Sequence, residues 1–149
     1  MKNNNVSKEI IRFLKIISSI LYFSTLIYIF FFARRRRHTT YNELNLVPFK
    51  NIIPETNSIH DFGSFNYNSN LVGNIIIFIP FSFILIEGFK VSKLSMVVLI
   101  AFIASFMVEF LQYIFKVGVA DINDIILNTT GAVIGYYIYS IYKRYIIKN

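Results

Sequence analysis

The sequence predicts an all-α integral membrane protein with four transmembrane helices and a polar loop between the first and the second. The first observation is the composition: 55% of the 149 residues are hydrophobic and only 15% are charged, which is unusual for a soluble domain. The second is the number of aromatic residues, 16 Phe and 10 Tyr, because a short soluble chain has too little interior to bury them. The third is the grouping of apolar residues into runs of about 20. Lipid must therefore cover much of the surface.

The first apolar run covers residues 16–33. At a helical rise of about 1.5 Å per residue, it nearly spans a hydrocarbon core of about 30 Å and is expected to form the first transmembrane helix. A cleaved signal peptide is the alternative, since Lys8, Arg12 and Lys15 precede the run. The run is too long for one, however, and no small-residue cleavage site follows it. Residues 1–15 are expected as a cytoplasmic N-terminal segment, ahead of a four-helix membrane domain over residues 16–149.

The remaining elements follow from the alternation of polar and apolar stretches. Residues 34–70 are polar and rich in turn-forming residues, so they are expected to form a loop, the only long segment outside the membrane. The second span is expected over residues 71–89 and the third over 94–115, as an antiparallel hairpin. The fourth is expected over residues 125–142, whose end is rich in the tyrosines and basic residues typical of a membrane interface.

The distribution of basic residues favours a multi-pass protein of the cell membrane with both termini in the cytoplasm. This orientation places nine of the 15 Lys and Arg residues inside and six outside. The four arginines at positions 34–37 oppose it, because they directly follow the first span. If the orientation holds, this charge lies on the disfavoured side, where a ligand can account for it.

The net charge of +7 does not indicate nucleic-acid binding, because the basic residues lie at the ends of apolar runs and not along one face. The sequence contains no cysteine, which excludes disulfides, thiolate metal sites and a cysteine nucleophile. No cofactor is expected.

Polar residues gather where this topology places one membrane face, and their helical spacing puts them on two facing stripes. The stripes are Ser105, Glu109 and Gln112 in the third span and Asp121, Asp124 and Asn128 at the start of the fourth. Glu109 would lie roughly 9 Å inside the end of its span, where a charge costs up to about 3 kcal/mol. It should therefore pair, protonate or contact water.

Structural interpretations compete with functional ones at these positions. Glu109 can form an ion pair with the arginine cluster or a hydrogen bond to another helix. Asp121 and Asp124 can simply cap the fourth helix. A divalent cation is a further alternative for the carboxylates, but the cluster has no histidine and no metal site is expected. Gly131 and Gly135 form a GxxxG pattern, which predicts close helix packing.

The order of four short motifs is more specific than any one of them. These motifs are NLVPF at 45–49, NLVGNIIIFIPF at 70–81, SFMVEFLQ at 105–112 and DINDIILNTTGAVIG at 121–135. In this order the chain resembles the VanZ family over most of its length. Two departures are Asn123, where many members carry an Asp, and the absence of a basic residue before Asp121. A role that needs three acids is therefore not expected.

The resemblance implies a cell-envelope membrane protein that contributes to teicoplanin tolerance in Gram-positive bacteria. By position, it assigns the family's motif residues to the same polar face found from the spacing. The expected ligand-binding residues are Arg36, Arg37, Asn45, Asn74, Glu109, Gln112, Asp121, Asp124 and Asn128. The expected partners are membrane lipids and a lipid-linked cell-wall precursor or lipoglycopeptide.

Three functions remain open at this point. The first is a protein that recognises or shields a lipid-linked or anionic ligand, with the arginines pairing with phosphate or carboxylate. The second is an intramembrane enzyme that acts on a lipid, with Glu109 and Asp124 as acid and base. The third is a structural partner of another membrane complex.

Overall fold

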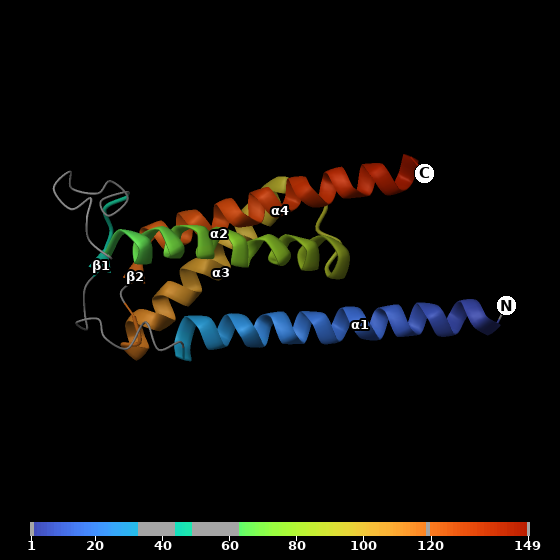
Figure 1. Ribbon diagram of the computed structural model, residues 1–149, viewed down its shortest axis with the longest axis horizontal. Helices are drawn as coiled ribbons and strands as arrows, with labels where there is room; N and C mark the ends of the chain where they lie inside the picture. Colours follow the sequence, from blue (N-terminus) through green and yellow to red (C-terminus); the bar gives the residue numbers. More distant parts are fainter. Residues whose placement is uncertain (1, 33–43, 49–62, 119, 149) are drawn as a thin grey trace. The chain divides into compact units, whose positions relative to one another are not determined.

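The computed structural model describes residues 2–32, 44–48, 63–118 and 120–148 (Figure 1). Within these residues the chain is helical apart from turns and two very short strands. It divides into two units, Met1–His38 and Thr39–Asn149, which are described separately. The predicted all-α class is confirmed.

The first unit is one long helix. Helix α1 comprises Lys2–Ile27 and continues as a π-helix, η1, at Tyr28–Phe32. The apolar part, Val6–Phe32, is long and apolar enough to cross a membrane. Three of its hydroxyl groups bond within the helix: Ser18 and Ser19 both donate to the carbonyl of Lys15, and Thr25 donates to that of Leu21. The expected span at residues 16–33 is therefore the later part of a longer helix, and most of residues 1–15 are helical. Their cytoplasmic location stays a prediction.

The second unit contains helices α2 (Gly63–Gly88), α3 (Leu94–Phe115) and α4 (Ile122–Lys148). Two of its segments, Leu71–Gly88 and Leu94–Phe115, are long and apolar enough to cross a membrane. With the first unit this makes three such helices among the described residues, which is the pattern of a multi-pass membrane protein. The tyrosine, asparagine and threonine residues of α4 lower its hydropathy, and its crossing of the membrane stays a prediction.

The predicted loop over residues 34–70 differs from the structure at two places. Helix α2 begins at Gly63, eight residues before the apolar segment begins at Leu71. The start of an apolar run marks where a helix enters lipid, whereas the helix itself can begin earlier in polar sequence. Strand β1, Leu44–Asn45, pairs in parallel with strand β2, Ala120–Asp121. The other residues of the predicted loop lie outside the described residues, apart from 46–48.

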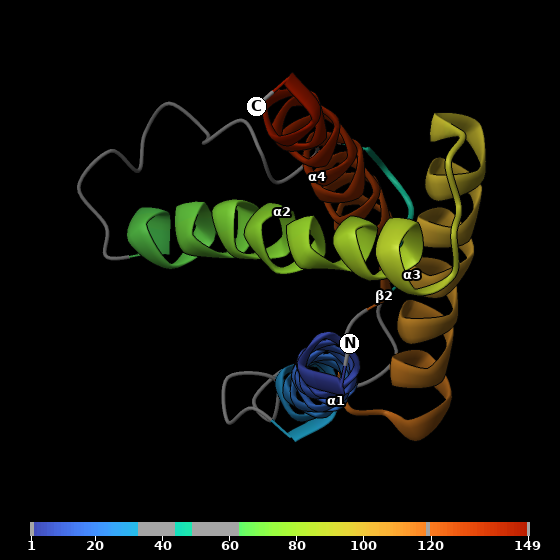
Figure 2. The ribbon, with the colours of Figure 1, turned by 90° about the vertical axis from the view of Figure 1, so that its right-hand side faces the viewer.

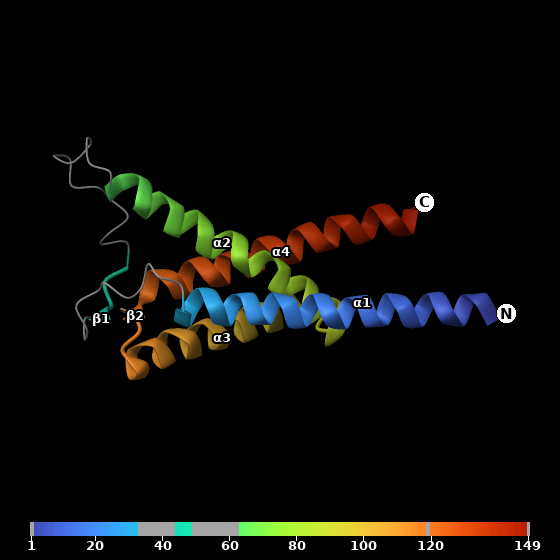
Figure 3. The same ribbon diagram turned by 60° about the horizontal axis from the view of Figure 1, so that its bottom comes forward.

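Helices α2 and α4 cross in close contact (Figure 3). A Cβ atom added at Gly131 would overlap the carbonyl oxygen of Ile75, and one at Gly135 would overlap that of Ile79. The Ser82 hydroxyl donates a hydrogen bond across the same contact to the Ala132 carbonyl. The GxxxG prediction is confirmed, since only glycine leaves room for this approach.

Helix α4 also packs against α3, on a different side from α2, as the end-on view shows (Figure 2). Helix α3 ends at Phe115 and is capped by Lys116, which adopts a left-handed conformation (φ 54°). The Val117 N–H then bonds to the Gln112 carbonyl, which closes the helix end and turns the chain toward β2. As a result, β1, the start of α2, the end of α3 and the start of α4 lie at one end of the unit (Figure 1).

Candidate functional site

The polar residues predicted from helical spacing do gather at this end of the second unit, which we call the polar end. It is defined by seven residues from five elements, β1, α2, α3, β2 and α4: Asn45, Asn74, Glu109, Gln112, Asp121, Asp124 and Asn128. Arg36 and Arg37, the other two predicted ligand-binding residues, lie outside the described residues.

Asp121 connects three elements of the polar end. Its Oδ1 accepts a hydrogen bond from the Asn123 N–H over 2.8 Å, which is the geometry of an N-cap for α4. Its Oδ2 accepts a bond from Nδ2 of Asn45 over 3.0 Å, beside the β1–β2 pairing. The capping interpretation of Asp121 is therefore correct, but the same carboxylate also fixes the segment around Asn45.

Glu109 lies at the contact between α3 and β2. Its side chain is only 3% exposed, and its Oε2 accepts a hydrogen bond from the Asp121 backbone N–H over 3.0 Å. Because burial removes this carboxylate from water, hydrogen bonds of this kind offset part of its desolvation cost. This bond goes to β2, directly before α4, and not to a residue within another helix as predicted. The predicted ion pair with the arginine cluster lies outside the described residues.

The two predicted stripes face each other across the α3–α4 contact in part, since Asp124 of the α4 stripe bonds to α2 instead. Ser105 and Gln112 are fully buried on α3, as is Asn128 on α4. Nδ2 of Asn128 donates a hydrogen bond to the Ser105 hydroxyl over 2.8 Å. This contact satisfies the Nδ2 donor of Asn128 deep in an apolar bundle, where an unpaired donor would be costly.

Asp124 belongs to a different contact from Glu109. Its Oδ1 accepts a hydrogen bond from Nδ2 of Asn74 over 2.6 Å, which ties the first turn of α4 to α2. Its carboxylate also lies near the N-terminus of α4, where the helix dipole favours negative charge. The two acids proposed as an acid–base pair therefore bond to different neighbours.

Oδ1 of Asn128 and Oγ1 of Thr129 are buried and have no hydrogen-bond partner among the described residues. These two residues are adjacent in the sequence of α4. Buried polar groups without partners are rare, because each costs about 1–3 kcal/mol. Thr129 is also one of the residues that line the groove described next.

A groove of about 550 Å³ opens between α3 and α4. Glu109 and Asp121 provide the carboxylates in its wall, and nearly all its other surface is apolar. The aromatic side is lined by Phe102, Phe106, Phe110 and Tyr113 of α3. The opposite side is lined by Ile122, Ile125, Ile126, Thr129 and Thr130 of α4, with Ala120 of β2 and Leu44 and Leu46 beside them. The groove is thus an almost wholly apolar surface whose lining includes two acidic residues.

The structure brings two of the predicted site residues, Glu109 and Asp121, to the groove. Asn45, Asn74, Gln112, Asp124 and Asn128 do not line it and instead hold the polar end together. The sequence prediction missed the aromatic wall, although its signal is readable. The four residues recur at spacings of four, four and three, which places them on one face of α3. In the part of the chain that the structure describes, no three His, Cys, Asp or Glu side chains gather to hold a metal ion.

Comparisons with known proteins agree with the motif order. The model of the VanZ/LLP1 family matches residues 17–143. Protein VanZ of Enterococcus faecium is 33% identical over 75 residues, which are 50% of this chain and 47% of that protein. The matched region thus spans about half the length of this relative. No solved structure is significantly similar to the chain.

Proposed function

Because the chain belongs to the VanZ/LLP1 family, we propose that it binds a lipid-linked ligand of the bacterial envelope at the polar end and so lowers susceptibility to lipoglycopeptides such as teicoplanin. The groove between α3 and α4 is the observation that carries this proposal. It is large enough for an acyl chain or part of a prenyl chain. A ligand with an apolar tail and a polar group matches its two kinds of surface.

The chemistry of the groove constrains the polar part of the ligand. Glu109 and Asp121 are hydrogen-bond acceptors when ionised and repel a phosphate. The group beside them should therefore be a donor, such as a sugar hydroxyl, an amide N–H or an ammonium. The arginines at positions 34–37, which the sequence favours as partners of a phosphate or carboxylate, lie outside the described residues. Lipid-linked cell-wall precursors and lipoglycopeptides both carry donors of these kinds.

The proposal is tested by filling the groove while the fold is kept. Thr130 is exposed and lines the groove, whereas Ile134, one turn further along α4, is exposed and does not line it. We expect wild type to raise the teicoplanin tolerance of a sensitive Gram-positive host. Thr130→Trp should remove that tolerance, and the matched control Ile134→Trp should keep it. Membrane levels are compared by immunoblot.

Each outcome of this assay bears on a separate part of the proposal. If wild type at full membrane level gives no tolerance, the resistance function is rejected for this chain. If wild type is active and Thr130→Trp is equally active, the groove is not the binding site. A variant with Arg34, Arg35, Arg36 and Arg37 changed to Gln tests the anionic part of the ligand separately.

An intramembrane enzyme is the second candidate function, and the geometry supports it less. An acid–base pair must reach one reacting centre. Glu109 lines the groove, while Asp124 accepts a bond from Asn74 and does not line it. A purely structural partner is the third candidate. It predicts that every variant of the polar end loses protein level in proportion to its activity.

A further inference from the structure

A second cavity, of about 460 Å³, lies between the α2–α3 connection and the C-terminal half of α4. Tyr136, Ser140, Lys143 and Arg144 of α4 line one side, and Ile86 of α2 and Ser92 of the connection line the other. This cavity lies where α2 ends and α3 begins. The polar end lies at the other end of α3, where α3 ends and α4 begins. Its residues play no part in the function proposed above.

The walls of this cavity are held by contacts between α4 and the α2–α3 hairpin. The Tyr136 hydroxyl donates a hydrogen bond to the Ser92 carbonyl over 3.1 Å. The Tyr139 hydroxyl donates to the Glu87 carboxylate, and the Tyr139 ring packs edge-on against Phe83 with centroids 5.5 Å apart. Fixed walls of this kind reduce the ordering cost of binding a ligand.

The charge around the cavity favours an anion. Lys143 and Arg144 line it directly and are exposed, so they can turn toward a ligand. Lys90 and Lys93 lie in the connection at the same end, which gives four basic residues against Glu87. Glu87 does not line the cavity, and its carboxylate accepts the Tyr139 hydroxyl. The local net charge is thus +3.

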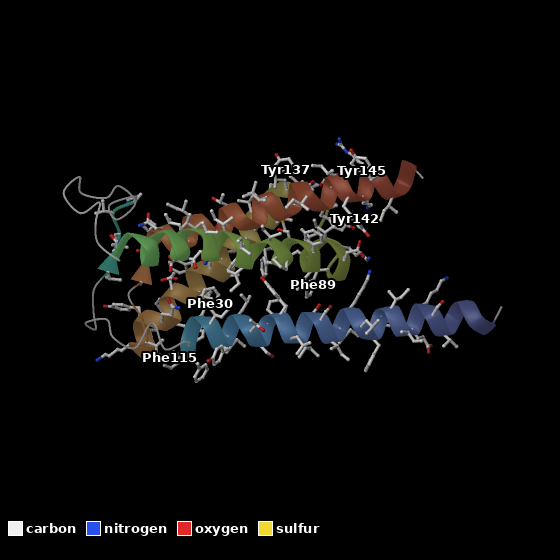
Figure 4. All side chains as sticks on the ribbon, viewed as in Figure 1. Phe30, Phe89, Phe115, Tyr137, Tyr142 and Tyr145 are labelled. Carbon is white, nitrogen blue, oxygen red and sulfur yellow. The ribbon has the colours of Figure 1, made fainter. Side chains whose placement is uncertain are left out.

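The position of the cavity matches the headgroup layer of a bilayer. The apolar segment of α2 ends at Gly88 and that of α3 begins at Leu94, so the connection between them lies at a membrane surface. Aromatic side chains labelled in Figure 4, Phe89 after α2 and Tyr137, Tyr142 and Tyr145 on α4, lie toward this end of the unit. Tyrosines and basic residues are enriched at this depth.

We propose that this cavity binds the phosphate headgroup of an anionic phospholipid. The Lys143 ammonium and the Arg144 guanidinium supply charge-assisted hydrogen bonds to phosphate oxygens. Ile86 offers an apolar contact to the lipid beyond the headgroup. Basic pockets between transmembrane helices are a recurrent solution for anionic lipids. The proposal does not depend on the ligand of the groove.

Native mass spectrometry of the purified full chain in detergent tests this site. The probes are phosphatidylglycerol, phosphatidylcholine and inorganic phosphate. Wild type should retain phosphatidylglycerol in preference to phosphatidylcholine. Lys143→Gln/Arg144→Gln should weaken that binding by about five- to tenfold, as expected for two partly exposed charge pairs. The control Lys8→Gln/Arg12→Gln removes the same charge from exposed positions on α1 and should stay within about twofold of wild type.

A second variant covers the case in which the double variant fails to fold. Ser140→Leu keeps every charge and fills part of the cavity, so it should also weaken phosphatidylglycerol binding. Helical content measured by circular dichroism identifies the folded variants. The proposal is overturned if folded variants of the cavity bind like wild type, or if the α1 control loses as much binding. It is also overturned if inorganic phosphate binds and the two lipids bind equally, since the site would then hold phosphate alone.

Discussion

The backbone N–H of Asp121 donates a hydrogen bond to Oε2 of Glu109 over 3.0 Å, and the Glu109 side chain is almost completely buried. This bond joins a carboxylate inside α3 to the residue that caps α4. The side chain of Asp121 extends this connection to β1, because its Oδ2 accepts a hydrogen bond from Nδ2 of Asn45. A change at Glu109 therefore affects both the charge in the groove and the connection between two helices.

The two roles of Glu109 can be separated by two substitutions. Glu109→Gln keeps an oxygen that can accept from the Asp121 N–H, whereas Glu109→Ala leaves this donor unpaired. We expect Glu109→Ala to lower the free energy of unfolding by about 1–3 kcal/mol more than Glu109→Gln does. The measurement is unfolding in detergent, followed by circular dichroism. Equal losses in the two variants would show that the hydrogen bond contributes little to stability.

The close approach of α2 and α4 depends on two glycines. We expect Gly131→Ala and Gly135→Ala each to destabilise the protein by about 1–3 kcal/mol, because the added methyl group meets the carbonyl oxygen of Ile75 or Ile79. Gly73→Ala on α2 is the matched control, since a Cβ atom there has no neighbour within 4 Å. Unfolding midpoints of the three variants in one detergent decide the question. A loss at Gly73 as large as at Gly131 would contradict the packing.

The hydrogen bond between Asn45 and Asp121 predicts that exchanging the two side chains restores stability lost in a single variant. Asp121→Asn keeps an oxygen for the cap but places an amide opposite Nδ2 of Asn45, so we expect a loss of about 1 kcal/mol. Adding Asn45→Asp restores a donor–acceptor pair with the roles reversed and should recover most of the loss. A double-mutant cycle of unfolding free energies measures this coupling. Additive effects of the two substitutions would mean that the side chains do not interact in solution.

The predicted orientation can be measured because the chain has no cysteine of its own. Single substitutions Lys93→Cys, Lys116→Cys and Tyr145→Cys each introduce one exposed thiol. With the termini in the cytoplasm, a membrane-impermeant maleimide should label Lys116→Cys in intact cells. The other two should react only after lysis.

Two results of this labelling would contradict the topology. Labelling of Lys93→Cys and not of Lys116→Cys in intact cells would reverse the orientation. Labelling of both Lys116→Cys and Tyr145→Cys in intact cells would show that α4 does not cross the membrane.

The sequence by itself determined the helices and the segments that need lipid. An apolar run of about 20 residues fits the hydrocarbon core of a membrane. In lipid such a run must be helical, because only a helix satisfies the backbone polar groups within the segment itself. The expected span over 94–115 coincides with α3 for this reason. Helical periodicity also placed Ser105, Glu109 and Gln112 on one buried face.

Only the tertiary structure decided which polar groups meet and where a ligand can enter. Asn45 and Asp121 are 76 residues apart, and Asn74 and Asp124 are 50 apart, so no local pattern links them. The parallel pairing of β1 with β2 involves two residues on each side, too few to produce a strand signal in the sequence. The groove lies between α3 and α4, and the position of α4 is set by its packing against both α2 and α3. Periodicity assigns a residue to a face of its own helix, whereas the neighbour of that face is set by the packing of the whole unit.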